Sequence, residues 1–301
     1  MSYKAEISRK NPTAFVFLID QSGSMGAESG INDENGNPVP KAQAVSDAIN
    51  SLIEELINRC QKREGINDYF DIALLGYGQK SNEAYFAWEG DLKGNDWCTI
   101  SQLKTNFVDE IKYNIEVVIR GKIETEKQTK KIWINPVAHG ITPMKAALIQ
   151  TKELLEDWIK DHKDSFPPIV INITDAWATD ISNKQELIDV ANDIKSLQTT
   201  DGNVIVFNCH IAGSKAQPTI FPSSIDDLPD DEHAYTLFSM SSELPEQYIN
   251  LIIEIFGKEA LTYKHAWGMA YNSPITALIK LLDIGTRVAV IKTANDDKAE
   301  Q

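Results

Sequence analysis

The sequence predicts an α/β fold with a doubly wound, mostly parallel central sheet that is flanked by helices. Two observations predict it. Apolar runs of strand length alternate with amphipathic helical segments, and several of these runs are apolar almost throughout, as expected of strands that are covered on both faces. One stretch in the first half of the chain departs from this alternation and is predicted to be a β-ribbon insertion.

The first strand, helix and second strand come early in the chain. Residues 14–19, AFVFLI, form an apolar run that predicts a buried strand. Residues 41–59 carry apolar side chains at helical spacing and predict an amphipathic helix. Residues 69–77, YFDIALLGY, predict a second buried strand.

Residues 79–138 interrupt this order. Within them, NIEVVIRGKIETEKQTKKIWINPV alternates like a β-ribbon. The insertion also holds Trp88, Trp97 and Trp133. We expect these to pack against the main sheet, because large aromatic side chains dominate cores, with a partner-binding face as the alternative.

The second half of the chain resumes the alternation. Pro143 stands at the first turn of a predicted helix, TPMKAALIQTKELLEDWIKDH, and PPIVINITD predicts the next strand. Ser182 and Gln185 have the spacing of a capping box before another helix, which the strand NVIVFNCHI follows. The segment AYTLFSM is predicted as a strand, and helices are predicted near residues 245–256 and 274–282.

Composition limits the compartment and the partners. The formal charge of -15 disfavours a surface that neutralises phosphates, so we expect neither nucleic acid nor an anionic membrane as a partner. Without a signal-like or membrane-spanning run, the chain is predicted to be cytoplasmic. Cys60, Cys98 and Cys209 are expected to be reduced, buried thiols. We predict one domain over the whole chain, with a core over about 12–290 and a disordered tail over 291–301.

Three polar clusters are predicted to meet at one edge of the sheet. Ligands of open α/β sheets bind at the carboxyl ends of strands. The clusters comprise Asp20, Ser22, Ser24, Thr142 and Asp175. Such an oxygen set suits a hard cation, so we predict Mg²⁺, with Mn²⁺ or Ca²⁺ as alternatives. Only two of these residues are carboxylates, so the ion would attract an acidic group from another protein. The competing interpretation makes each cluster a helix cap or turn.

The motifs DQSGSM, GITPM and TDAWATD resemble, in this order, the three loops of the metal-ion-dependent adhesion site (MIDAS) of von Willebrand factor type A (vWA) domains. KAQAVSDAINSLIEEL, FPPIVINITD and FNCHI resemble intracellular bacterial members of that family. The resemblance implies that Ser22 and Ser24 bind the metal directly and that Thr142 is a direct or switchable ligand. It implies that Asp20 and Asp175 act mostly through water or hydrogen bonds.

The resemblance also implies a function, and this chain departs from the family pattern at one position. Bacterial relatives are commonly non-enzymatic adaptors beside AAA+ ATPases, or beside kinases and phosphatases, in stress and defence systems. Family members usually have glycine after the third-loop aspartate, whereas this chain has Ala176. Because a β-carbon disfavours positive φ, we expect this loop to differ, with Asp180 as a candidate accessory acid.

Two other functions compete with the adaptor. One is a Mg²⁺-dependent hydrolase or phosphatase that uses Asp20 as its nucleophile, although that chemistry typically wants a second acid two residues on, where this chain has Ser22. The other is a scaffold that binds partners without metal. The histidines are scattered and expected to be structural, apart from His139, which lies close enough to Thr142 in sequence to line the pocket.

Overall fold

A computed structural model describes residues 3–33, 35–63, 65–78, 83–119, 122–212, 217–257, 261 and 265–293. Most of the tail predicted to be disordered, residues 294–301, lies outside the described residues. In the described part of the chain, no helix has the length and apolarity needed to cross a membrane.

One mixed sheet forms the centre of the molecule, in the order β15-β16-β14-β11-β1-β6-β7, with β8 also paired to β6. The parallel strands are β1 (Thr13–Asp20), β6 (Phe70–Tyr77), β11 (Ile169–Thr174), β14 (Ile205–Ile211) and β16 (Met269–Ser273). The antiparallel edge strands are β7 (Ala84–Phe86), β8 (Cys98–Thr99) and β15 (Thr219–Ile220). The predicted α/β fold, with a mostly parallel central sheet flanked by helices, is confirmed.

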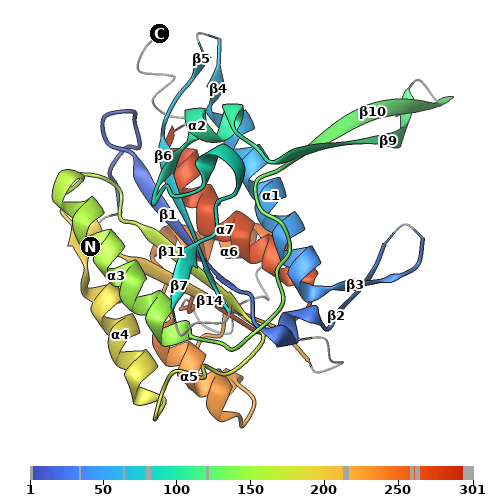
Figure 1. Ribbon diagram of the computed structural model, residues 1–301. Coiled ribbons are helices and arrows are strands. Elements are labelled where there is room, and N and C mark those ends of the chain that lie inside the picture. Colours follow the sequence, from blue (N-terminus) through green and yellow to red (C-terminus); the bar gives the residue numbers. More distant parts are fainter. Residues whose placement is uncertain are drawn as a thin grey trace.

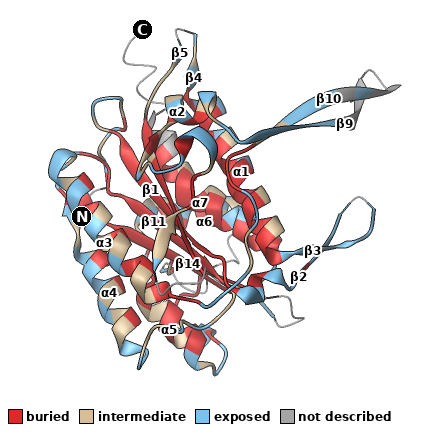
Figure 2. Ribbon diagram, in the orientation of Figure 1, coloured by how far each residue is buried: buried red, intermediate tan, exposed pale blue. Residues whose placement is uncertain are grey.

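Helices cover both faces of this sheet (Figure 1). One face carries α1 (Lys41–Cys60), α2 (Ile100–Thr105), α6 (Glu246–Phe256) and α7 (Ile275–Thr293). The other carries α3 (Met144–Asp161), α4 (Gln185–Ser196) and α5 (Glu232–Met240). Figure 2 shows the result as a buried sheet between helices whose outer surfaces are exposed.

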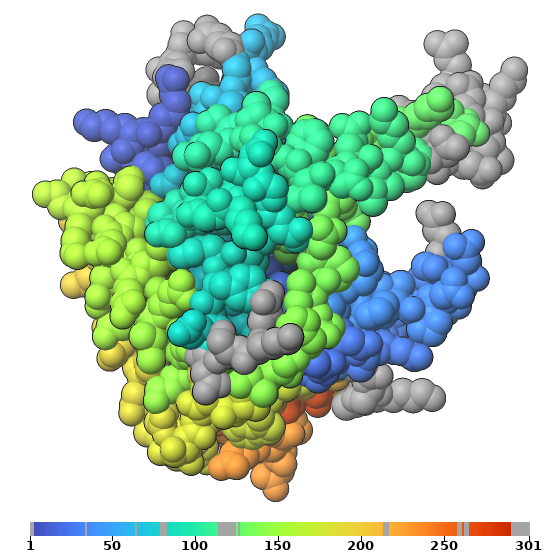
Figure 3. Space-filling model, viewed as in Figure 1, coloured from blue at the N-terminus to red at the C-terminus, as the bar shows by residue number. Residues whose placement is uncertain are grey.

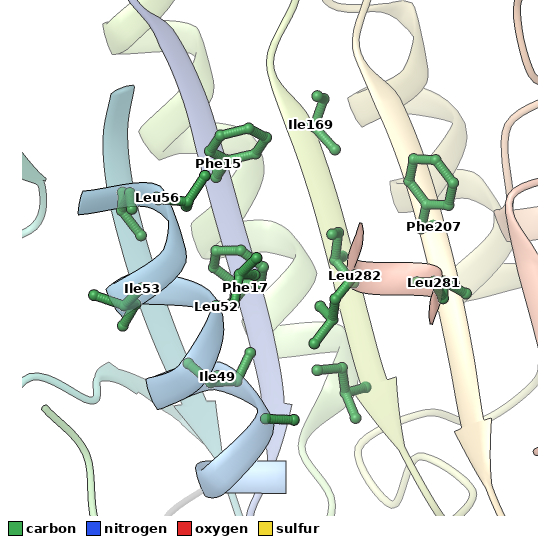
Figure 4. Packing of buried hydrophobic residues seen from close by; sticks show 14 of the residues in the cluster. Phe15, Phe17, Ile49, Leu52, Ile53, Leu56, Ile169, Phe207, Leu281 and Leu282 are labelled. Atoms are coloured by element: carbon green, nitrogen blue, oxygen red, sulfur yellow. The ribbon is translucent and has the colours of Figure 1, made fainter. Parts of the chain in front are cut away.

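Strand β1 shows why the sheet needs helices on both faces. All eight of its residues are buried. Because side chains alternate along a strand, Phe15 and Phe17 enter one core, whereas Val16 and Leu18 enter the other. Figure 4 shows the first core, in which the α1 side chains Ile49, Leu52, Ile53 and Leu56 lie over the two phenylalanines.

Two assignments made from the sequence are wrong. AYTLFSM forms most of helix α5 rather than a strand, because the Asp231 carboxylate caps the helix by accepting from two backbone N–H groups, and Ala234 and Leu237 bury one helical face. Ser182 and Gln185 form no capping box. The Asn183 side chain accepts from the Gln185 backbone N–H instead, and the first residue of α4 follows Lys184. Strand β16 was not predicted.

The insertion forms the predicted ribbon and packs at its base. Strands β9 (Asp109–Ile119) and β10 (Lys122–Ile132) pair antiparallel and project from the body (Figures 1 and 3). Trp88 and Trp133 are buried in the core, and Trp97 packs beside Trp158, with ring centroids 6.3 Å apart. The expected packing of these tryptophans is therefore confirmed.

Short elements complete the chain. The hairpins are β2 (Glu28–Asn32) with β3 (Pro38–Pro40), β4 (Gln61–Lys62) with β5 (Gly65–Ile66), and β12 (Gln198–Thr199) with β13 (Gly202–Asn203). The 3-10 turns are η1 (Gly23–Gly26), η2 (Gly90–Leu92) and η3 (Ile225–Asp227). Cys60, Cys98 and Cys209 are free and buried, as predicted.

Candidate metal centre

Asp20 ends the central strand β1 and lies between two neighbouring strands. Its carboxylate is fully buried. One oxygen accepts the backbone N–H of Ser22 at 2.9 Å, and the other accepts the Thr174 hydroxyl from β11 at 2.7 Å. Burial raises the pKa of Asp20 to about 6, against the effect of the hydrogen bonds from Ser22 and Thr174. Asp20 therefore shapes the first loop and joins it to the third.

A chain of side-chain hydrogen bonds continues from the first loop to Asp175. The Ser22 and Ser24 hydroxyl oxygens lie 2.9 Å apart, and the Ser24 hydroxyl donates to Asp175 Oδ1 at 2.6 Å. These residues are separated by about 150 positions in sequence and meet because β1 and β11 are adjacent and parallel. The structure thus brings together four of the five predicted ligands, Asp20, Ser22, Ser24 and Asp175, through direct contacts.

The second loop is tied to both of the others. The Gly23 N–H donates to the Gly140 carbonyl at 3.2 Å, and the His139 N–H donates to the Gln21 carbonyl at 2.8 Å. On its other side, Thr142 exchanges two hydrogen bonds with Thr179, one through each backbone group of Thr142. Buried Thr142 therefore lies in a loop that touches the first and third loops.

The loop after Asp175 accommodates alanine without strain. Among the described residues, positive φ outside glycine occurs only at Tyr3, Phe221 and Asn272. Ala176 is therefore in an ordinary conformation, and its backbone N–H donates to the Thr174 hydroxyl oxygen at 3.2 Å. The β-carbon of Ala176 therefore meets no backbone strain here, and whether the loop differs from that of vWA domains stays a prediction.

Two residues predicted as accessories have other contacts. The two Asp180 oxygens accept the backbone N–H groups of Lys145 and Ala146, at 3.2 Å and 2.8 Å, in the first turn of α3. Asp180 is therefore a cap supplied from another segment. His139 is exposed and contacts the first loop through its backbone.

Three contributors to the site were missed from the sequence. Thr174 orients Asp20. Gly78 leaves room for the first loop, since a β-carbon there would lie 2.2 Å from the Gln21 carbonyl carbon, and its φ of +149° is one that other residues rarely adopt. Lys41 is the third, with its ammonium 2.8 Å from Asp175 Oδ2. The glycine was visible in the segment GYGQKS, but the contacts that explain it are long-range.

The spacing of the two serine hydroxyls suits a small hard cation. Neighbouring ligands of an octahedral ion bound at about 2.0 to 2.1 Å lie about 2.9 Å apart. The Ser22 and Ser24 hydroxyl oxygens have that separation, and the same distance also fits the hydrogen bond between them. No three His, Cys, Asp or Glu side chains gather at one point in the described residues, so an ion here would depend on hydroxyl ligands.

Apolar and aromatic side chains border the loops. Ile141 and Trp177 are each 40% exposed, and they belong to the second and third loops, which the Thr142–Thr179 bonds join. Trp177 stacks on His233 with ring centroids 4.5 Å apart, and His210 packs beside His233 at 5.0 Å. Burial lowers the pKa of each histidine to about 4. The polar site therefore has a partly apolar rim.

Comparison with known proteins finds no matching family model and no matching curated protein. Among solved structures, the chain is similar to the PilB minor pilin from Streptococcus sanguinis, with 12% identity and a TM-score of 0.40, over 93% of this chain and 62% of that one. It is also similar to the vWF domain of the type V pili tip protein Mfa5 from Porphyromonas gingivalis, with 13% identity and a TM-score of 0.29, over 59% and 48%. The pilus adhesin RrgA from Streptococcus pneumoniae is also similar, with 14% identity and a TM-score of 0.27, over 58% of this chain and 22% of that one. The chain spans less than two thirds of the length of each of these structures.

Proposed function

We propose that this edge of the sheet is a divalent-cation-dependent site for binding another protein, of the vWA type. Ser22, Ser24 and Thr142 would hold Mg²⁺ directly, while Asp20 and Asp175 orient the hydroxyls and balance part of the charge. The ion would supply positive charge for an aspartate or glutamate side chain of the partner.

The hydrogen-bonded chain from Ser22 through Ser24 to Asp175 carries this proposal. It gathers hydroxyl and carboxylate oxygens from two distant segments at the carboxyl edge of the sheet. A helix cap alone would not need such convergence, because one acceptor beside one helix end is enough to make it. A chain of formal charge -15 also repels acidic partners at long range, so a bound cation would make an acidic contact locally favourable.

The proposed module is non-enzymatic. A phosphatase would need Asp20 as an accessible nucleophile, but Asp20 is fully buried and each of its oxygens accepts a hydrogen bond. Attack on a phosphoester would first require those bonds to break. The geometry therefore favours a binding role over a hydrolytic one.

The apolar rim adds a second kind of contact, which a partner would make around its acidic residue. Exposed Trp177 and Ile141 would contact apolar groups around the partner's acidic residue, and aromatic side chains are effective anchors at protein interfaces. We infer an intracellular adaptor, in keeping with the three free, buried cysteines. An AAA+ ATPase, or a kinase or phosphatase of a bacterial stress or defence system, is the partner class that the resemblance to bacterial vWA proteins implies.

Calorimetry with Mg²⁺ tests the ion site directly. We expect Ser22→Ala to weaken Mg²⁺ binding by at least about tenfold, the lower end of the effect seen when even an outer ligand of a metal site is removed. Ser46→Ala is the matched control, because Ser46 is also buried but donates to the Gln43 carbonyl within α1. Equal binding by wild type and Ser22→Ala would reject the assignment.

A second measurement tests the bridging role. Proteins captured by the wild type in Mg²⁺ should be lost with chelator and with Ser22→Ala, but retained by Ser46→Ala. The affinity of an identified partner should then fall when its contacting acidic residue is changed to the amide. Capture that persists in chelator would favour a metal-free scaffold, and Mg²⁺-dependent phosphoester hydrolysis lost with Asp20→Ala would favour the phosphatase.

A further inference from the structure

Lys41 occupies an unusual place for a lysine. It is the first residue of α1, whose first turn contains no acidic residue and whose preceding residue, Pro40, provides no side-chain cap. The amino end of a helix carries partial positive charge and disfavours a cation. Lys41 is nevertheless buried there. Contacts within the helix do not explain why this lysine is buried, so the explanation lies in its contact with a distant residue of the chain.

That contact is with the acid at the centre of the proposed site. Lys41 Nζ donates to Asp175 Oδ2 at 2.8 Å, with the Lys41 side chain 10% exposed and the Asp175 side chain 0% exposed. The other oxygen of the same carboxylate accepts the Ser24 hydroxyl at 2.6 Å. The Lys41 backbone N–H is also fixed, by the Ala27 carbonyl at 2.9 Å. The ammonium is thus held against one carboxylate oxygen while the predicted ion ligands gather at the other.

Two cations would then share one buried carboxylate. An ion held by the Ser24 hydroxyl would be separated from Asp175 only by that hydroxyl, which donates to Asp175 Oδ1. The Lys41 ammonium contacts the other oxygen, Oδ2. Charges in a buried site are screened far less than charges in water. Each cation therefore reduces the attraction of Asp175 for the other.

We propose that Lys41 is a tethered cation that competes with the divalent ion for Asp175 and keeps the ion's affinity low until an acidic partner residue completes the site. This inference rests on the proposed function. Without ion, the ammonium preserves the arrangement of Asp175 and Ser24. With ion and partner together, the partner's carboxylate offsets the added positive charge, so each strengthens the binding of the other.

Calorimetric titration with MgCl₂ and MnCl₂ tests the inference on three variants. Lys41→Met should bind the ion at least about tenfold more tightly than wild type, because the competing charge is gone. Lys41→Arg keeps the charge and should stay within about threefold of wild type. Lys145→Met is the matched control, since Lys145 pairs with Glu186 at 2.5 Å and contacts none of the proposed ligands. It should also remain within about threefold.

Equal or weaker ion binding by Lys41→Met overturns the inference, as does an equal gain in Lys145→Met, which would indicate only a change in overall charge. If wild type binds Mg²⁺ and Lys41→Met is unchanged, only this inference fails and the ion site stands. If neither wild type nor any variant takes up Mg²⁺ or Mn²⁺, the proposed function fails together with it.

A measurement on the wild-type protein covers the case in which Lys41→Met does not fold. Brief acetylation with acetic anhydride, followed by mass spectrometry, reports how accessible each lysine amine is. Lys41 should be protected without ion and should become more reactive in saturating Mg²⁺, whereas Lys145 should not change. Lys41 reactivity that is the same in both conditions overturns the inference.

Discussion

Asp20 is the last residue of β1, and Asp175 directly follows the adjacent strand β11, but the two carboxylates have different partners. Asp20 is held by a backbone N–H and a threonine hydroxyl, both neutral donors, and burial raises its pKa to about 6. Asp175 contacts the Lys41 ammonium as well as the Ser24 hydroxyl. Asp20 therefore shapes the edge of the sheet, whereas Asp175 links the first loop, the third loop and helix α1.

The largest expected effect comes from removing the charge of Asp175. Asp175→Asn leaves the Lys41 ammonium buried without a counter-charge, which should lower the free energy of unfolding by about 3 to 5 kcal/mol. Urea denaturation measures this loss. The double variant Lys41→Met/Asp175→Asn should recover part of it, because no charge is left unpaired. A double variant whose loss equals or exceeds the sum of the two single losses would show that the pair does not behave as a unit.

The second effect sharpens the other side of the comparison. Thr174→Val removes the hydroxyl that donates to Asp20 Oδ2, and hydrogen bonds to charged groups contribute about 1.5 to 3 kcal/mol. We expect a loss of that size in the free energy of unfolding. Thr151→Val is the control, since Thr151 is fully buried but its hydroxyl donates to the Ala147 carbonyl within α3. Similar losses of unfolding free energy in both variants would mean that the hydrogen bond from Thr174 to Asp20 contributes no more than one to a backbone carbonyl.

These two aspartates also show how far the sequence alone reaches. Their positions follow from local pattern, since AFVFLI and IVINIT are buried strands whose ends must lie at the same edge of a parallel sheet. The partners of Asp175 do not follow, because Lys41 is 134 positions away and looked like the start of an amphipathic helix. A lysine in the first turn of a helix is a weak clue in hindsight.

The same limit explains the misassigned segments. AYTLFSM contains aromatic and β-branched residues that favour strands, but Asp231 in front of it and the three-residue spacing of Ala234 and Leu237 specify a helix. Strand β16 contains the polar pair Asn272 and Ser273, but it lies in the sheet between β14 and β15, and its residues Met269, Ala270 and Tyr271 pack in the two cores. A local helix cap outweighed strand propensity in the first case, and tertiary contacts decided the second.

A pH titration probes the aromatic rim beside Asp175. Burial and the nearby His210 lower the folded-state pKa of His233 to about 4, and the negative charge of Asp231 offsets part of this shift. The unfolded chain therefore binds more protons than the native protein between about pH 6.5 and 4, so stability should fall as pH falls through that range. The slope should be up to about 1.4 kcal/mol per pH unit for this histidine.

Denaturation of wild type and His233→Gln at pH 7, 6, 5 and 4.5 isolates that slope. Asp20 has the opposite sign, because its raised pKa means that the native protein binds more protons as pH falls below about 6. That contribution is present in both proteins and cancels in their difference. Parallel stability curves for the two proteins would exclude His233 as the titrating group.

The smallest expected effect concerns Asp180, the third acid near these loops. Asp180→Asn keeps one acceptor for the backbone N–H groups of Lys145 and Ala146 but removes the negative charge at the amino end of α3. A charge at a helix end contributes about 0.3 to 1 kcal/mol, so the free energy of unfolding should fall by that amount. Because the carboxylate faces α3 rather than the Ser22–Ser24 pair, Mg²⁺ affinity in calorimetry should stay within about threefold of wild type. A large loss of Mg²⁺ affinity in Asp180→Asn, with stability unchanged, would instead make Asp180, rather than Asp175, the third-loop acid of the ion site.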